Sequence, residues 1–221
     1  MKNQNPNHSR FGGSSAHRWM HCPYSARPEF QIADEGGSAA KRGTAMHAAA
    51  EDLWHGRESK LAAADLKTVA EYVAFLRDLL RGPDCKLEFK AHAPSIHDEA
   101  FGTIDYVDYH LGVLTIVDLK TGKGVVDAED NKQLLFYAIA VEDTLNIKPN
   151  EYRFYIWQNG EARLWMPDPE IVVGARFAMR DAATRCDFAE PVMGDWCEWC
   201  KVKSCPAKNK IAETMKGLVN W

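Results

Sequence analysis

The chain has 221 residues, of which 46% are hydrophobic and 26% charged, so it can bury a sizeable core and is not globally disordered. Its net charge of −4 gives no electrostatic footprint for nucleic acid over the whole chain, so any such contact must rely on a local patch. No apolar run has the length of a membrane span, and residues 1–10 lack the apolar stretch of a secretory signal. We therefore expect a cytoplasmic protein with no membrane partner, whose cysteines are reduced thiols or metal ligands.

Helical patterns dominate the first part of the chain. Residues 1–13 are polar and end in two glycines, and we expect a flexible tail there. Residues 14–27 predict a short helix. A loop at 32–43 precedes an alanine-rich helix at 44–56, and apolar residues at helical spacing predict a further helix at 64–80.

The pattern then changes to strands. Alternating apolar residues predict three strands at 86–93, 100–110 and 112–120, with the last two joined by a tight turn at Leu111–Gly112. Helical spacing returns at 128–145.

The last part of the chain predicts a hairpin and a helix. Asn159–Gly160 is a strong hairpin turn between strands within 151–167, and Asp168 with Pro169 begins a long helix that ends near residue 186. A cysteine-rich loop and a short terminal helix follow. The order of elements predicts an α/β fold in which helices flank a mixed β-sheet.

The stretch LTIVDLKTGKG, residues 114–124, raises the question of function. Side chains alternate along a strand, so Asp118 and Lys120 project to one face, and pairing with the preceding strand brings Asp105 beside Asp118. Two adjacent carboxylates raise each other's pKa, and a hard divalent cation removes that cost. The pattern therefore predicts a Mg²⁺ site for phosphodiester hydrolysis, with Lys120 orienting water or stabilising developing charge. Asp-x-Lys alone more often marks a solvated strand face.

Two predicted helices carry further polar pairs at a spacing of four residues. His47 and Glu51 share a face of one helix, and Gln133 and Tyr137 share a face of another. A lone histidine on an alanine-rich helix is more often a surface or satisfied interior residue than a ligand. Likewise Glu51 is better explained as a solvated side chain than as part of a site, and Tyr137 alone as a core residue.

Taken in order, these motifs resemble the RecB-type branch of the PD-(D/E)xK nuclease superfamily. The resemblance runs from Gly43 to Tyr137, and it includes GTAMH with Gly43 and His47, GTID with Asp105, DLK with Asp118 and Lys120, and QLLFY with Gln133 and Tyr137. It implies a restriction-endonuclease-like core with a central mixed sheet and a metal-dependent DNA nuclease, with exonuclease action favoured over endonuclease action.

The resemblance also implies roles for individual residues. Those that would hold Mg²⁺ or Mn²⁺ are His47, Asp105, Asp118 and the backbone carbonyl of Leu119. Lys120 would be catalytic, and the helix with Gln133 and Tyr137 would support the site. Glu88 matches a recurrent strand acid of the family, although it could instead pair with Lys86 or Lys90.

Three cysteines near the C-terminus have the spacing of a metal or cluster site. Cys197, Cys200 and Cys205 form C-x₂-C-x₄-C, which needs a fourth ligand. The layout resembles that of AddB-like proteins and CRISPR-associated RecB-like exonucleases, which implies Cys22 as the fourth ligand of a 4Fe–4S cluster joining the termini. Cys186 is the reserve fourth ligand, and Zn²⁺ bound by the same thiols, with His21 as a spare ligand, is the alternative.

The resemblance divides the chain into a tail at 1–13, a nuclease domain at 14–190 and a cysteine-bearing segment at 191–221 that packs back on Cys22. DNA is the expected partner, with a recombinase or single-strand-binding protein as a further one, in a bacterial or phage-infected cytosol. The basic residues that could follow DNA phosphates are Arg10, Arg18, Lys41, Arg42, Lys120, Lys123 and Lys132.

Other interpretations stay open. Trp19, Trp196 and Trp199 flank the cysteines, where they either stack on bases or pack around a cluster. The alternatives to a nuclease are a DNA-binding or recombination accessory module without catalysis, and an iron–sulfur redox or sensing protein. A monomer and a ring-shaped oligomer both fit the sequence.

Overall fold

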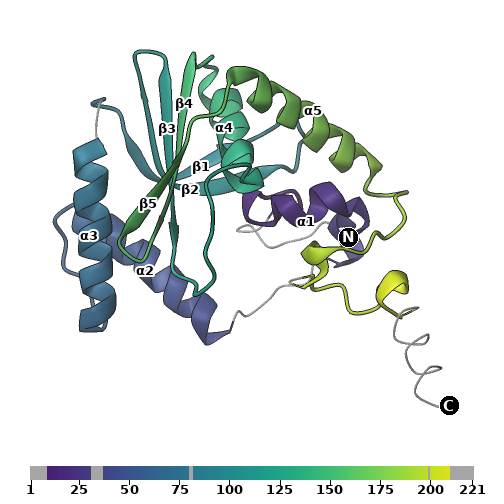
Figure 1. The fold of residues 1–221 in the computed structure, drawn as a ribbon, viewed down its shortest axis with the longest axis horizontal. Helices are drawn as coiled ribbons and strands as arrows, with labels where there is room; N and C mark the ends of the chain where they lie inside the picture. Colours follow the sequence, from purple (N-terminus) through teal and green to yellow (C-terminus); the bar gives the residue numbers. More distant parts are fainter. Residues whose placement is uncertain (1–8, 31–36, 80–81, 199, 210–221) are drawn as a thin grey trace.

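A five-stranded mixed sheet forms the centre of the computed structural model, which describes residues 9–30, 37–79, 82–198 and 200–209 (Figure 1). The strands lie in the sheet in the order in which they occur in the chain. Neighbouring strands are antiparallel except β3 and β4, which are parallel and are connected by helix α4. The strands are β1 (Lys86–His92), β2 (Phe101–His110), β3 (Val113–Lys120), β4 (Glu151–Gln158) and β5 (Glu161–Trp165).

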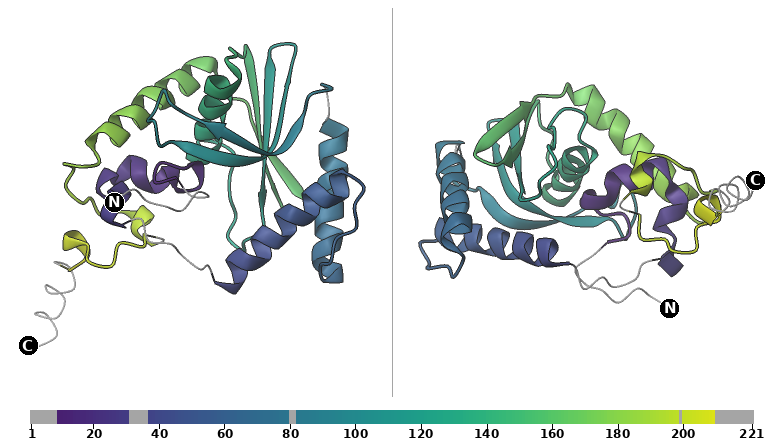
Figure 2. Two further views of the ribbon diagram at one scale, coloured as in Figure 1. Left: turned by 180° about the vertical axis from the view of Figure 1, so that it is seen from behind. Right: turned by 60° about the horizontal axis from the view of Figure 1, so that its bottom comes forward.

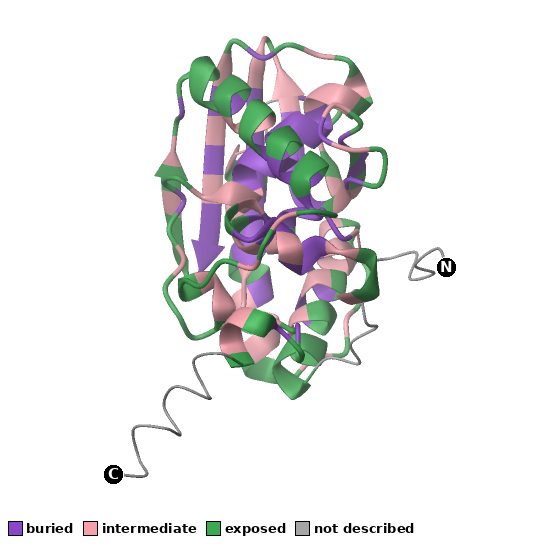
Figure 3. Ribbon diagram, turned by 90° about the vertical axis from the view of Figure 1, so that its right-hand side faces the viewer, coloured by how far each residue is buried: buried purple, intermediate pink, exposed green. Residues whose placement is uncertain are grey.

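Helices cover both faces of this sheet (Figures 1 and 2). One face carries α2 (Ser38–Trp54) and α3 (Ala63–Leu79), and the other carries α4 (Lys132–Leu145), with α5 (Pro169–Arg185) and α1 (Ala16–His21) packed against it. Helix α4 is buried along most of its length, whereas α5 has an exposed outer face (Figure 3). None of the described helices is both long and apolar enough to cross a membrane.

Side-chain alternation divides the interior into two cores. Ile116 and Ile156 belong to the core on the α4 side, whereas Val117 and Trp157 belong to the core under α2 and α3. The side chain of Asp118 therefore leaves β3 on the α4 side, at the carboxyl end of the strand.

The structure confirms the mixed α/β fold, with a sheet flanked by helices, and the two tight turns. Leu111 and Gly112 have φ angles of 50° and 82°, and Asn159 and Gly160 have φ angles of 54° and 84°. Positive φ at both central residues matches the twist of the strands that such turns connect. The segment at 14–27 forms α1 between two 3₁₀ turns, η1 (Gly13–Ser15) and η2 (Pro23–Ala26).

Two predicted boundaries are wrong. The tail was expected to extend to residue 13, but Phe11 is fully buried against the edge of the Trp19 ring, and Trp19 Nε1 donates to Gly12 O at 3.0 Å. The loop expected at 32–43 is wrong from Ser38 onward, because α2 begins there. Residues 1–8 and 31–36, and the terminal helix beyond Asn209, lie outside the described residues.

Candidate active site

The register pairing between β2 and β3 ends just before Asp105 and Asp118. Regular pairing runs from His110↔Val113 to Tyr106↔Val117. Beyond that point the backbone N–H of Leu119 donates to Asp105 Oδ2 at 2.6 Å. The Asp105 carboxylate therefore accepts from an N–H that would otherwise donate to a backbone carbonyl of the neighbouring strand. Asp105 is held in this way at the break between β2 and β3.

Three side chains from three elements meet at this break. His47 Nδ1 of α2 lies 2.9 Å from Asp105 Oδ1 of β2 and 3.6 Å from Glu88 Oε1 of β1. One ligand atom from each of these residues lies within 4.8 Å of the other two. An imidazole with two carboxylates suits divalent cations such as Mn²⁺, and the carboxylates suit Mg²⁺. The residues therefore fit a bound divalent cation.

The backbone is strained where Glu88 enters this group. Glu88 has a φ of 46°, in the left-handed region that non-glycine residues rarely adopt, and β1 has no register partner at this residue between Leu87↔Tyr106 and Phe89↔Ile104. A conformation of this kind costs about 1–3 kcal/mol and is typical of functional sites.

The two carboxylates of this group stabilise a positive charge on His47. Burial lowers the pKa of His47, but the Asp105 and Glu88 carboxylates outweigh it and raise the pKa of His47 to about 10. The imidazole is therefore protonated near neutral pH in the absence of a cation. A cation that uses its ring nitrogen must displace that proton, so binding at this group is coupled to pH.

A second polar network lies beside this group on the α4 side. Lys120 Nζ lies 2.7 Å from Asp118 Oδ2 and donates to Gln133 Oε1, also at 2.7 Å. Gln133 Nε2 donates to Asp118 Oδ1 and to Tyr137 Oη, each at 2.7 Å. Gln133 is thus the residue that joins the acid, the lysine and the tyrosine.

Burial controls the protonation of this network. Burial raises the pKa of Asp118, the Lys120 ammonium opposes that shift, and the Asp105 carboxylate adds to it. Burial, followed by the charges of Asp118 and Asp105, also raises the pKa of Tyr137 well above its ordinary value. Tyr137 therefore keeps its proton near neutral pH.

The structure brings together most of the residues singled out in the sequence, in a different grouping. Glu88 joins His47 and Asp105 instead of pairing with Lys86 or Lys90, while Asp118 pairs with Lys120. Leu119 contributes its N–H to Asp105. Glu51, by contrast, is 42% exposed and lies 4.0 Å from Arg57, outside the group.

Sequence reasoning missed Tyr72 of α3. Its buried hydroxyl has no hydrogen-bond partner among the described residues. Burial, followed by the charges of Asp105 and Asp118, raises the pKa of Tyr72 well above its ordinary value, so the hydroxyl is a neutral donor within the field of these acids. No sequence pattern identifies it, because it lies among the regularly spaced core residues of α3.

The cysteine segments at the two ends of the described chain lie side by side, where α1 contacts η4 (Asp195–Cys197). The N–H of Val192 approaches Cys22 Sγ at 3.5 Å. Burial raises the pKa of Cys22, the Val192 backbone opposes this, and the charges of Cys200 and Cys197 raise it further. Cys22 and Cys205 are buried, and within the described ranges no three thiols come within 4.8 Å of one another.

Cys186 lies in different surroundings. Its Sγ is 3.6 Å from Arg10 Nη1 and 3.2 Å from Asp187 Oδ1. Arg10 is 9% exposed and is bound to Glu99 at 2.7 Å, so the expectation that it lines an open DNA channel is wrong. The ion pair of Arg10 with Glu99 attaches the N-terminal segment to the rest of the protein.

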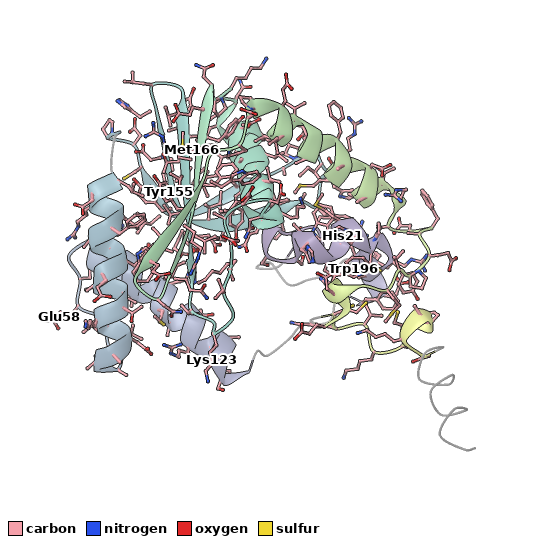
Figure 4. All side chains as sticks on the ribbon, in the orientation of Figure 1. His21, Glu58, Lys123, Tyr155, Met166 and Trp196 are labelled. Atoms are coloured by element: carbon pink, nitrogen blue, oxygen red, sulfur yellow. The ribbon has the colours of Figure 1, made fainter. Side chains whose placement is uncertain are left out.

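The aromatic residues near the cysteines pack within the protein. Trp19 is fully buried. The rings of His21 and Trp196 stack with centroids 4.6 Å apart and an interplanar angle of 9°, and Figure 4 shows these two side chains together between α1 and the C-terminal segment. His17 Nε2 lies 3.5 Å from Asp195 Oδ2 across the same contact. Trp199 lies outside the described residues.

Comparison with known proteins identifies a family, and solved structures with distant similarity include the one described below. A family model described as "Protein of unknown function (DUF2800)" matches residues 8–68 and 58–218 of this chain. A crystal structure of SSO0001 aligns with 94% of this chain and 89% of its own, at 13% sequence identity and a TM-score of 0.42. That score is too low to argue for a shared fold.

Proposed function

The chain belongs to the DUF2800 family, whose function is unknown, and we propose from its own site that it is a metal-dependent DNA nuclease, with exonuclease action favoured. The observation that carries the proposal is the placement of the His47–Glu88–Asp105 group beside the Asp118–Lys120 pair. The order of these motifs resembles that of RecB-type nucleases, and the mixed sheet flanked by helices is consistent with a restriction-endonuclease-like core.

In this proposal His47, Glu88 and Asp105 hold Mg²⁺ or Mn²⁺. A bound cation supplies Lewis-acid polarisation of a phosphodiester and a more acidic water. Asp105 is itself held by the N–H of Leu119, which limits its movement and favours a fixed ligand geometry.

Lys120 provides positive charge next to that group. Its ammonium donates to Gln133 Oε1 and forms an ion pair with Asp118 Oδ2. The side chain is 24% exposed, so part of the ammonium is accessible to a substrate oxygen. A fixed ammonium stabilises the negative charge that develops on a phosphate during attack.

The test uses end-labelled linear DNA and closed circular DNA, incubated with Mg²⁺, Mn²⁺ or EDTA. We expect degradation of the linear form that EDTA abolishes and that Asp105→Asn and Lys120→Met each reduce by about 100-fold or more. Glu51→Gln is the matched control, because this acid lies on the same helix as His47 but outside the group. Equal cleavage of the circular form would make the enzyme an endonuclease.

Two results would overturn the proposal. Cleavage that persists in EDTA or in Asp105→Asn would remove the site from the reaction. Failure of the folded protein to cleave DNA in either cation, with retained DNA binding, would favour an accessory module without catalysis.

We further propose that Cys22, Cys197, Cys200 and Cys205 hold an iron–sulfur cluster. The support is the packing of Cys22 against the C-terminal segment and the influence of Cys197 and Cys200 on its thiol. Iron, sulfide and zinc content of protein purified without oxygen tests this assignment. Zinc with no iron would replace the cluster by the alternative zinc site, and Cys22→Ser should reduce the content of whichever metal is bound.

A further inference from the structure

The loop that leaves β3 directly after Lys120 passes beside the candidate site and is exposed from Gly122 to Val125. Its first residue is fixed to α2, because Arg42 Nη1 donates to Thr121 O at 3.2 Å. Figure 4 shows Lys123 beside the first turns of α2. The loop therefore forms part of the surface around Lys120.

A buried glutamine holds this loop from beneath. Gln158, at the end of β4, is the register partner of Lys120 and is only 1% exposed. Its Nε2 donates to Gly122 O at 3.0 Å and to Gly124 O at 2.7 Å, and its Oε1 accepts from the N–H of Val126 at 3.1 Å. All of these hydrogen bonds of a buried side chain hold an exposed segment in one conformation.

These contacts determine where the donors of the loop point. In a trans peptide the C=O of one residue and the N–H of the next point in opposite directions. Because the carbonyls of Gly122 and Gly124 face Gln158, the N–H groups of Lys123 and Val125 face away from it, toward solvent. Neither N–H has an acceptor among the residues that the structure describes.

Neither backbone conformation nor packing in the fold requires glycine at Gly122 or Gly124. Neither Gly122 nor Gly124 has a positive φ, and a Cβ built on either would meet no atom within 4 Å. Glycine also allows close approach of a ligand to the backbone, and open space on the outer side of this loop fits that use.

We propose that this loop, Thr121–Val126, is a binding subsite for a backbone phosphate of the nucleic acid next to the site of cleavage. The N–H groups of Lys123 and Val125 and the Lys123 ammonium bind the phosphate, and Gln158 is the positioning residue. The inference rests on the proposed nuclease function.

The test measures binding of a fluorescently labelled oligonucleotide in EDTA, where cleavage does not interfere, over a range of salt concentrations. Lys123→Ala should weaken binding and reduce the salt slope by about 0.7–0.9, the value for one phosphate contact. Gly124→Ala should weaken binding by about tenfold, or about 1.4 kcal/mol, with the charge and the melting temperature unchanged.

Matched controls separate the subsite from general effects. Lys67→Ala removes an exposed lysine from α3, and Gly174→Ala adds a methyl group where a Cβ also meets nothing within 4 Å. Both should bind DNA as the wild type does. Gln158→Met keeps the charge and approximate size but frees the loop, so KM should rise while kcat at saturating DNA is retained.

Wild-type binding by both Lys123→Ala and Gly124→Ala would overturn the subsite. If the wild type then still cleaves DNA with Mg²⁺ or Mn²⁺, the proposed nuclease function stands and only the subsite is lost. A wild type that neither binds nor cleaves DNA would overturn both.

Discussion

Replacing Gln133 by leucine should destabilise the protein far more than a change at a partly exposed polar residue usually does. The substitution removes the donor to Asp118 Oδ1 and to Tyr137 Oη and the acceptor for Lys120 Nζ. Asp118 and Tyr137 are 2% and 5% exposed, so water cannot easily replace these contacts.

The expected loss of stability depends on which former partners of Gln133 are buried and left without a hydrogen bond. Lys120 is 24% exposed and can recruit water, so its loss contributes little. A buried polar group without a partner costs about 1–3 kcal/mol, and two such groups give about 2–4 kcal/mol after allowance for the part-buried position of Gln133. For a chain of this size that corresponds to a fall in Tm of about 4–16 °C.

Thermal and urea unfolding of the metal-free protein measure this effect, with Tyr137→Phe as the comparison. Tyr137→Phe removes one neutral hydrogen bond and leaves Gln133 bound to Asp118, so it should cost only about 1 kcal/mol. If Gln133→Leu costs no more than Tyr137→Phe, the view of Gln133 as the centre of the network is refuted.

Three further predictions concern stability without a bound cation. In EDTA, the pKa of His47 is about 10 in the folded state against 6.5 in the unfolded state. Its contribution to the free energy of unfolding should therefore be complete below about pH 6.5 and lost as the pH rises through about 10. Urea titrations of His47→Gln should lack this pH dependence. Tyr72→Phe deletes a buried hydroxyl that has no partner among the described residues, so calorimetry should show an unchanged or higher Tm, and a clear fall would reveal a partner. Arg176→Met leaves Glu142 and Asp143 without the guanidinium that joins α5 to α4, and urea unfolding should show a loss of about 2–4 kcal/mol, which a loss below 1 kcal/mol would contradict.

Local patterns in the sequence were sufficient to predict the sheet and its turns. Period-two alternation identified β1 to β3, and Asn159–Gly160 marked the β4–β5 hairpin, because these features depend on neighbouring residues alone. Phe11 was misjudged since a single aromatic residue in a polar segment has no periodicity, and its burial depends on Trp19 and on distant parts of the chain.

The grouping of the acids could not be predicted in the same way. Strand pairing predicted that Asp105 lies near Asp118, and the Asp105 carboxylate does act on the pKa of Asp118. The pairing did not predict that the Asp105 carboxylate accepts from the N–H of Leu119, or that Glu88 reaches His47 from a left-handed backbone. Competition between a side chain and the backbone ladder, and a single unusual φ angle, leave no trace in alternation patterns.

The meeting of the two ends of the described chain has a consequence for biosynthesis. Trp19 and Cys22 lie in the earliest part of the chain, yet α1 packs on α4, α5 and η4, which are made more than a hundred residues later. At about 5–20 residues per second, the ribosome needs on the order of ten seconds to supply those partners. During that interval Phe11 and Trp19 have no core to enter, so the nascent N-terminal segment should be accessible to chaperones until α5 has left the ribosome.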